Sequence, residues 1–388
     1  MTARRFKKFS DTVPGLRALC GVLALTLVGL AVWLADPIAL QRLRLAQFDQ
    51  FQRWHPRAYS PVPVRIVDID EAALKAYGQW PWPRARIAEL VERLDSAGAA
   101  VIVFDVLMTE PDRNAPAAMA QLWNDPQASA ALAHLPDPDQ TLANTLQHSP
   151  VVLGSSLAHN GPKMPKPPNL PYRMVISGGT ETITWLRGFE SALWPLPSLT
   201  ANARGVGALN AAVDSDGVLR RVPLLMRLEP TEPVPSLSAE ALRVAQGAQN
   251  YALRGQAGGV QDVRIGAVTV PTDAQGEMWL HYTLDEPARF ISATQVLSGT
   301  ASRNLLQGHI VLIGSSAAGL MDMRSNPLGQ QMPGVQAHAM ALEQMLLGQY
   351  LQRPSWATGL EAVVLAVGAL VLGLIGLTLP ARWATVAL

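Results

Sequence analysis

Five polar side chains follow short apolar segments, at positions where they could act together. They are Asp68, Asp70, Asp105, Ser315 and Ser316. In open α/β sheets, ligands bind outside the carboxyl ends of the parallel strands, so we expect these five residues to form a ligand-binding edge. Three carboxylates beside hydroxyl groups could also hold a hard cation such as Mg²⁺ or Ca²⁺ through oxygen.

Two other hypotheses explain the aspartates. In the structural one, they accept hydrogen bonds from the first turns of following helices and pair with Arg84 or Arg86. In the catalytic one, Asp68-Ile-Asp70 matches the start of haloacid-dehalogenase-type phosphatases. In that chemistry the first Asp attacks phosphorus and the second is the acid and base. The match is short, and Ala72 stands where those enzymes usually have Thr or Val.

Three other residues are expected to be structural. His338 lies on the apolar face of a predicted helix and should be buried and hydrogen-bonded, with pH sensing or ligation as the alternative. Trp80 and Trp82 are expected to be packed core aromatics rather than a ligand cage.

A strand–helix–strand unit should position the aspartates. Residues 64–71 begin with β-branched and apolar residues, which predicts a strand on which Asp68 and Asp70 share one face while it lasts. From Arg84, apolar residues recur at helical spacing, and Gly98 follows as a helix end. Residues 100–104 are continuously apolar, as in a strand that is covered on both faces. We therefore expect a βαβ unit with parallel strands and a right-handed connection.

The rest of the chain predicts further elements around this unit. The expected helices are one or two over residues 115–135, ended by Asp137 and Pro138, and one each over 236–245, 293–297 and 335–347. The expected strands lie over 150–154 and 180–187, twice within 263–282, and over 310–313, where the strand should be buried. Residues 160–172 should form a proline-rich surface loop, and Asp216-Gly217 should form the turn of a hairpin. The predicted fold class is α/β: a mixed sheet with a parallel βαβ core and an antiparallel insert, flanked by transmembrane helices.

Composition excludes several classes of protein. The net charge of +1 gives no overall field toward nucleic acid, so we expect no nucleic-acid partner. Cys20 is the single cysteine of the 388 residues, which excludes a disulfide framework and a cysteine-based metal site. No cofactor is predicted.

Two uncharged segments, residues 18–35 and 362–381, are each long enough to cross a bilayer. Basic residues before the first segment keep the N-terminus in the cytoplasm by the positive-inside rule. The predicted division is a cytoplasmic basic tail (1–17), a transmembrane helix (18–35), a domain outside the cytoplasm (36–359), a second transmembrane helix (360–380), and residues 381–388 as a cytoplasmic end or the start of a further span. Residues 38–51 would either continue the first span as a stalk or form a solvated connector.

Two blocks of sequence resemble a known family. V-D-I-D-E (67–71), W-P-W-P-R (80–84) and V-F-D-V-L-M-T-E-P-D (103–112) resemble the opening of the CHASE type two sensory domain. V-L-I-G-S-S-A-A-G-L-M-D (311–322) and P-G-V-Q-A-H-A (333–339) resemble its closing block. That family consists of extracytoplasmic sensors of bacterial cyclases, histidine kinases and similar receptors.

The resemblance implies that residues 36–359 are a periplasmic sensor domain in a bacterial inner membrane. The sensor would bind a small molecule or ion, act as a homodimer in the lipid bilayer, and regulate a nucleotide cyclase or histidine kinase without being an enzyme itself. That effector is not among these residues, and we expect residues 383–388 to begin another span. The rival hypotheses are a membrane-anchored periplasmic hydrolase using Asp68 and Asp70, and a structural scaffold of the envelope.

Overall fold

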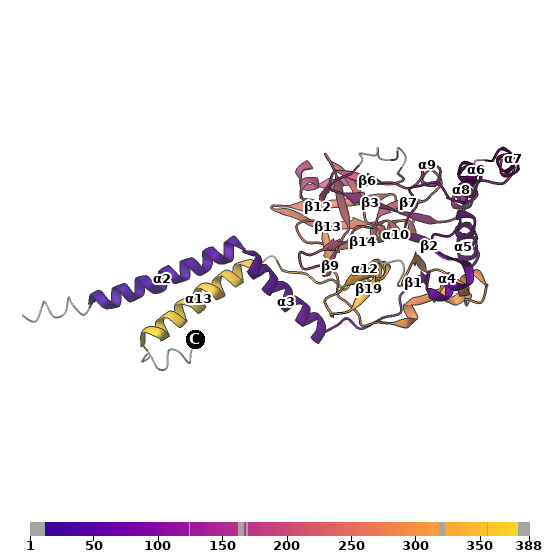
Figure 1. The fold of residues 1–388 in the computed structure, drawn as a ribbon. Helices are drawn as coiled ribbons and strands as arrows, with labels where there is room; N and C mark the ends of the chain where they lie inside the picture. The colour runs from indigo at the N-terminus through magenta and orange to yellow at the C-terminus, as the bar shows by residue number, and fades with distance from the viewer. Residues whose placement is uncertain are drawn as a thin grey trace, which may run out of the picture. The chain divides into compact units, whose positions relative to one another are not determined.

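The computed structural model describes residues 12–123, 125–161, 167, 170–317, 323–354 and 356–378. The chain forms two compact units, one of residues 51–352 and one of residues 1–50 with 353–388 (Figure 1). Most of the predicted basic tail, much of the predicted loop over 160–172, and the predicted turn and further span after Thr378 lie outside the described residues.

A seven-stranded, mostly parallel sheet forms the centre of residues 51–352. Its strands are β1 (Val64–Asp68), β2 (Val101–Leu107), β3 (Val151–Ala158), β6 (Ser191–Leu193), β7 (Gly205–Ala208), β16 (Phe290–Ser292) and β17 (Ile310–Gly314). The order is β16-β1-β17-β2-β3-β6, with β7 also pairing with β3, and β6 runs antiparallel to β3. The predicted strands β1 and β2 run parallel as expected. They are not neighbours, however, because β17 lies between them and pairs with both.

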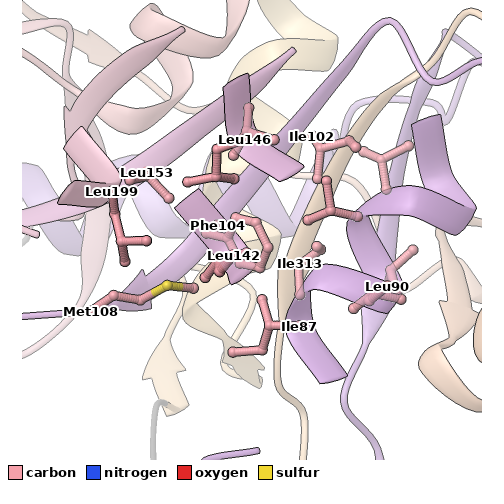
Figure 2. Close-up of a cluster of buried hydrophobic side chains, with 14 of the residues drawn as sticks. Ile87, Leu90, Ile102, Phe104, Met108, Leu142, Leu146, Leu153, Leu199 and Ile313 are labelled. Carbon is pink, nitrogen blue, oxygen red and sulfur yellow. The ribbon is translucent and has the colours of Figure 1, made fainter. Parts of the chain in front are cut away.

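Helices cover both faces of this sheet. On one face, Ile87 and Leu90 of α5 (Arg84–Ser96) and Leu142 and Leu146 of α8 (Pro138–His148) pack in one cluster with Phe104 of β2 (Figure 2). On the other face, α10 (Leu237–Ala245) and α12 (Gly334–Leu347) contribute to a second cluster. Side chains of a strand alternate between faces, so even-numbered β1 residues such as Ile66 enter the second cluster, whereas Val67 enters the first.

Smaller sheets and short helices complete this unit. The remaining strands are β4 (Arg173–Ser177), β5 (Gly188–Phe189), β8 (Ala212–Val213), β9 (Leu219–Pro223), β10 (Leu225–Leu228), β11 (Glu232–Pro235), β12 (Asn250–Gln256), β13 (Gly259–Ile265), β14 (Val268–Pro271), β15 (Glu277–Trp279), β18 (Met323–Ser325) and β19 (Gln331–Pro333). The remaining helices are α4 (Glu71–Tyr77), α6 (Pro116–Trp123), α7 (Pro126–Leu132), α9 (Pro197–Thr200), α11 (Ala293–Leu297), and the 3₁₀ helices η1 (Thr180–Trp185), η2 (Pro287–Arg289) and η3 (Arg303–Leu305). The predicted hairpin about Asp216-Gly217 is confirmed as the antiparallel pair β8–β9.

Three local predictions were wrong. The first strand ends at Asp68, because Asp70 caps the start of α4 (Glu71–Tyr77) instead of continuing the strand. Asp137 and Pro138 do not end a helix but begin α8: the Asp137 carboxylate accepts a hydrogen bond from the Asp139 N–H, and proline is well tolerated in a first turn. Residues 180–185 form the 3₁₀ helix η1 rather than a strand.

The second unit contains α2 (Thr12–Ala35), most of α3 (Ile38–Trp54) and α13 (Ala357–Thr378). Helices α2 and α13 pack side by side (Figure 1). Asp36, with a φ of 43°, breaks the chain between α2 and α3, so α3 does not continue α2 as one straight helix. Among the described residues, no helix taken singly has the length and apolar composition to cross a membrane. The pair Cys20–Ala35 and Ile38–Trp54, bent by 74°, meets that requirement only together. The two flanking spans therefore stay a prediction.

Candidate functional site

Strands β1 and β17 come from the two sequence blocks described above. They pair with each other, and their carboxyl ends meet at the same edge of the sheet. Asp68, the last residue of β1, pairs in register with Gly314, the last residue of β17. The Asp68 carboxylate accepts hydrogen bonds from the Ser316 backbone N–H, at 2.8 Å, and from the Ser316 hydroxyl, at 2.5 Å. Ser315 donates its hydroxyl hydrogen to the Ile69 carbonyl at 2.8 Å. The structure thus brings Asp68, Ser315 and Ser316 together, because the carboxyl ends of adjacent parallel strands coincide.

Asp70 lies beside this group but has a different role. Its carboxylate accepts a hydrogen bond from the Ala73 N–H at 2.7 Å, which caps α4, and another from the Ser292 hydroxyl at 3.1 Å. The capping hypothesis is therefore confirmed for Asp70. The predicted pairing of these acids with Arg84 or Arg86 is wrong. Arg84 forms its ion pair with Asp139, at 3.5 Å, and Arg86 forms one with Glu89, at 3.9 Å.

Asp105 lies two strands away from Asp68. It belongs to β2, and β17 separates β2 from β1. Alternation along each strand places Asp105 on the same side of the sheet as Asp68. A spacing of about 4.8 Å per strand separates the two backbones by about 10 Å. The described residues include no group of three or more His, Cys, Asp or Glu side chains arranged to hold a metal ion, so a site made of three carboxylates is not supported.

The pKa of Asp68 is shifted by its surroundings. Its side chain is buried, and burial raises the pKa of its carboxyl group. Hydrogen bonds from Ser316 oppose that shift, and the nearby charge of Asp70 adds to it. The net direction is upward, so Asp68 accepts a proton more readily than an exposed aspartate does.

Helix α12 begins against this edge. A Cβ atom added to Gly314 would lie 2.5 Å from the Cβ of Val335, in the first turn of α12. Only glycine allows the end of β17 and α12 to approach so closely. The 14 residues of α12 then extend over about 20 Å at 1.5 Å per residue. His338 on this helix is buried, as predicted.

At the other end of α12, a buried carboxylate joins two arginines from distant segments. Glu343 accepts a hydrogen bond from Arg57 Nη2 at 2.7 Å and another from Arg289 Nε at 2.7 Å. The side chains of all three are at most 2% exposed. Arg57 follows the point where the chain enters residues 51–352, and Glu343 lies shortly before the point where it leaves them.

Two glutamines connect the same segments through the backbone of residues 279–283. Gln52 donates a hydrogen bond to the Leu280 carbonyl at 2.7 Å. Gln344 donates one to the Trp279 carbonyl at 2.8 Å and accepts one from the His281 N–H at 2.8 Å. We call Gln52, Arg57, Arg289, Glu343 and Gln344 the entry–exit network. Sequence reasoning missed it, although an acid within the apolar run of residues 335–347 is a signal for a buried ion pair.

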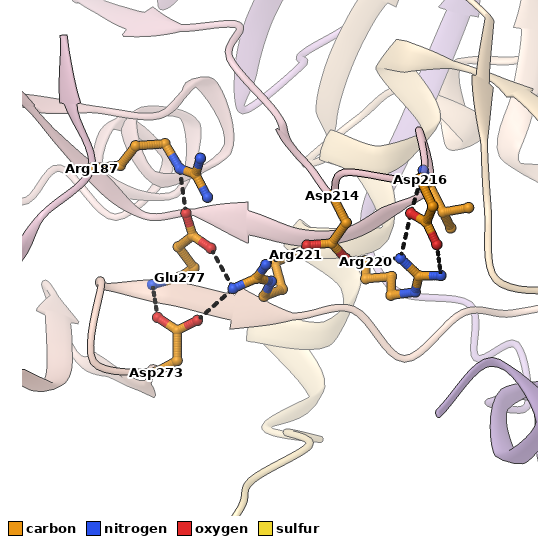
Figure 3. Close-up of polar contacts among 8 residues, drawn as sticks. Arg187, Asp214, Asp216, Arg220, Arg221, Asp273 and Glu277 are labelled. Carbon is orange, nitrogen blue, oxygen red and sulfur yellow. Dashed lines mark hydrogen bonds and ion pairs between the residues drawn. The ribbon is translucent and has the colours of Figure 1, made fainter. Parts of the chain in front are cut away.

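A second charged network has a structural role. Figure 3 shows Arg187, Asp214, Asp216, Arg220, Arg221, Asp273 and Glu277 joined by ion pairs. It ties the β8–β9 hairpin to β15. Burial raises the pKa of Glu277, whose carboxylate pairs with Arg187 at 2.6 Å.

The predicted core role of Trp82 is also confirmed, since it is buried and donates its indole N–H to the Gly78 carbonyl at 2.9 Å.

Comparison with known proteins gives one match. A family model described as the CHASE2 domain matches residues 22–377. No curated protein and no solved structure matches the chain.

Proposed function

The chain belongs to the CHASE2 domain family of extracellular sensory domains, and on this premise we propose that it is the sensing region of a bacterial transmembrane receptor. A bound small molecule or ion, or a change of condition, would shift the balance between two arrangements of the sensor. The flanking helices would pass that shift to an effector such as a nucleotide cyclase or a histidine kinase. The family match carries this proposal, because it covers the α/β unit together with most of α2 and α13.

We propose that α2 and α13 cross the inner membrane, with the N-terminus in the cytoplasm and residues 36–359 in the periplasm. The exposed side chains of the two helices support this proposal. Leu25 and Leu34 on α2 are each 74% exposed, and Val364 on α13 is 61% exposed. An apolar surface of this kind is unfavourable in water and suits hydrocarbon. The basic residues before residue 18 support the orientation.

The proposed signal path runs along α12. A ligand that binds at Asp68, Ser315 and Ser316 would act on Gly314 and Val335, where β17 and α12 are in close contact. A shift of α12 would then reach Glu343 and, through it, Arg57 in the segment that follows α3. Such sliding of a packed helix is a common form of conformational switching. By analogy with other receptors of this design, we propose that the sensor acts as a homodimer.

We do not propose the rival hydrolase. Its chemistry needs both Asp68 and Asp70 directed at a substrate, whereas the Asp70 carboxylate caps α4 and is bound by Ser292.

Alkaline phosphatase fusions test the topology, because that enzyme is active only outside the cytoplasm. A fusion after Gln352 should be active, and a fusion after Leu388 should be inactive. An inactive fusion after Gln352 in a stably expressed chain would overturn the proposed orientation.

A cyclase reporter fused after Leu388 tests transmission. Glu343→Gln should change its output, whereas Glu89→Gln, on an exposed ion pair of α5, should not. Equal output from the wild type and both variants would contradict transmission through the entry–exit network.

A further inference from the structure

A pocket of about 410 Å³ lies between the start of β4 and the end of α10. Its lining includes Tyr172, Arg173, Arg204, Arg243, Val244 and Gln249. The volume falls within the range of about 300–1,000 Å³ that is typical of small-molecule sites. None of the residues at the Asp68 edge lines it, so it is a separate feature of the fold.

Hydrogen bonds fix the walls of this pocket. Arg243, on the last turn of α10, donates to the Ala248 carbonyl at 2.6 Å and to the Arg204 carbonyl at 3.1 Å. The Arg173 N–H donates to the Gln249 carbonyl at 2.9 Å. Tyr172 packs edge-on against the buried ring of Tyr251, with ring centres 5.6 Å apart. The three segments that form the pocket are thereby held in place before any ligand arrives, which lowers the entropic cost of binding.

The pocket has an excess of positive charge. Glu240 neutralises Arg243, since its carboxylate accepts hydrogen bonds from that guanidinium at 2.6 and 2.9 Å. Arg173 and Arg204 are exposed, and within the described part of the chain neither forms an ion pair with an acid. Arg173 and Arg204 both line the pocket, and no acidic residue is among the residues that line it.

Apolar groups form another part of the lining. Leu170, Pro171 and Val244 lie there beside the arginines. An arginine fork matches the oxygens of a carboxylate or a phosphate group, and the apolar residues suit a short hydrocarbon body.

We propose that this pocket binds a small organic anion, with its carboxylate or phosphate group on Arg173 and Arg204 and its apolar part against Pro171 and Val244. Binding of the anion does not depend on the proposed sensory function. Only the signal that binding would produce rests on that function. Helix α10 carries Arg243 and packs against α12, so an occupied pocket would act on the helix that ends in the entry–exit network.

Binding to the purified full chain in detergent tests the proposal. The probes are n-butyl phosphate, butyrate, inorganic phosphate and the uncharged butyramide, titrated calorimetrically at constant ionic strength. We expect saturable binding of butyrate or butyl phosphate and none of butyramide. Arg173→Gln and Arg204→Gln should each weaken that binding by roughly tenfold or more, because each removes charge-assisted hydrogen bonds. The matched control is Arg264→Gln, which removes the same charge from an exposed site on β13, two strands away from β4 in the same sheet.

Several outcomes would overturn the proposal. They are an absence of saturable binding by all four probes, butyramide binding as tightly as butyrate, or Arg264→Gln weakening binding as much as the pocket variants. Binding of inorganic phosphate alone would refute the apolar part of the proposed ligand. If the anion binds but the output of a cyclase reporter does not change, the proposed anion site stands and the proposed sensory function is contradicted.

Discussion

Replacing Glu343 by glutamine should strongly destabilise the α/β unit of residues 51–352. The substitution keeps the size of the side chain but removes its negative charge. In the wild type, that charge faces the guanidinium groups of Arg57 and Arg289, at 2.7 Å each. After the substitution, two cations would be buried side by side without a counter-charge, and a glutamine cannot accept hydrogen bonds with both of its terminal atoms.

The magnitude follows from burial. Removing one partner of a buried ion pair costs about 3–5 kcal/mol, because the remaining charge stays buried and uncompensated. Glu89, with a side chain that is 44% exposed in its pair with Arg93, provides the comparison. Exposed pairs of this kind contribute about 0–1 kcal/mol. The predicted difference between the two Glu→Gln variants is thus at least about 2 kcal/mol in the free energy of unfolding.

Urea unfolding of the full chain in detergent, followed by tryptophan fluorescence, measures this difference. The wild type, Glu343→Gln, Glu89→Gln, Arg57→Met and the double variant Arg57→Met/Glu343→Gln should be compared. Because Arg57 and Glu343 contact each other, the double variant should lose less stability than the sum of the single losses. A loss for Glu343→Gln no larger than that for Glu89→Gln would refute the reasoning, and so would strictly additive losses.

Three further predictions concern the sheet edge and its supports. Burial raises the pKa of Asp68 above its ordinary value of 3.8, so its contribution to stability is greatest below that pH and is lost as the pH rises through the raised value. The melting temperature of Asp68→Asn minus that of the wild type should therefore increase as the pH rises from 4 to 7. A difference in melting temperature that stays constant over this range would contradict the prediction. Gly314→Ala should cost about 1–3 kcal/mol by overpacking against Val335. Val335→Ala in the same chain keeps the Val335 Cβ but removes the two Cγ atoms, each 2.8 Å from the added Cβ, and should therefore recover only part of the loss. Asp137→Ala should cost about 1 kcal/mol in urea unfolding, because it removes the cap of α8, and no loss would show that the cap is dispensable.

Elements with a strong local pattern could be predicted from the sequence. Helix α5 has apolar residues at helical spacing, and these residues are buried as expected. The run Ile310–Gly314 is apolar throughout because helices cover both faces of the sheet. Ser236 caps α10, and Asp216-Gly217 forms a turn, since both features depend on a few adjacent residues.

The role of each aspartate could be predicted only in part. The order of sequence segments placed Asp68, Ser315 and Ser316 at one edge of a parallel sheet. Whether Asp70 faces a ligand or caps a helix depends on where β1 ends, and that is decided by how the following residues pack.

The sequence by itself determined which segments form strands and helices and which of their faces are apolar, because these properties depend on the local spacing of side chains. Only the tertiary structure decided that β17 is inserted between β1 and β2 and that Glu343 pairs with Arg57, 286 residues away along the chain. Such contacts have no local signature. They result from competition among all strands and helices for partners, which is settled when the whole core packs.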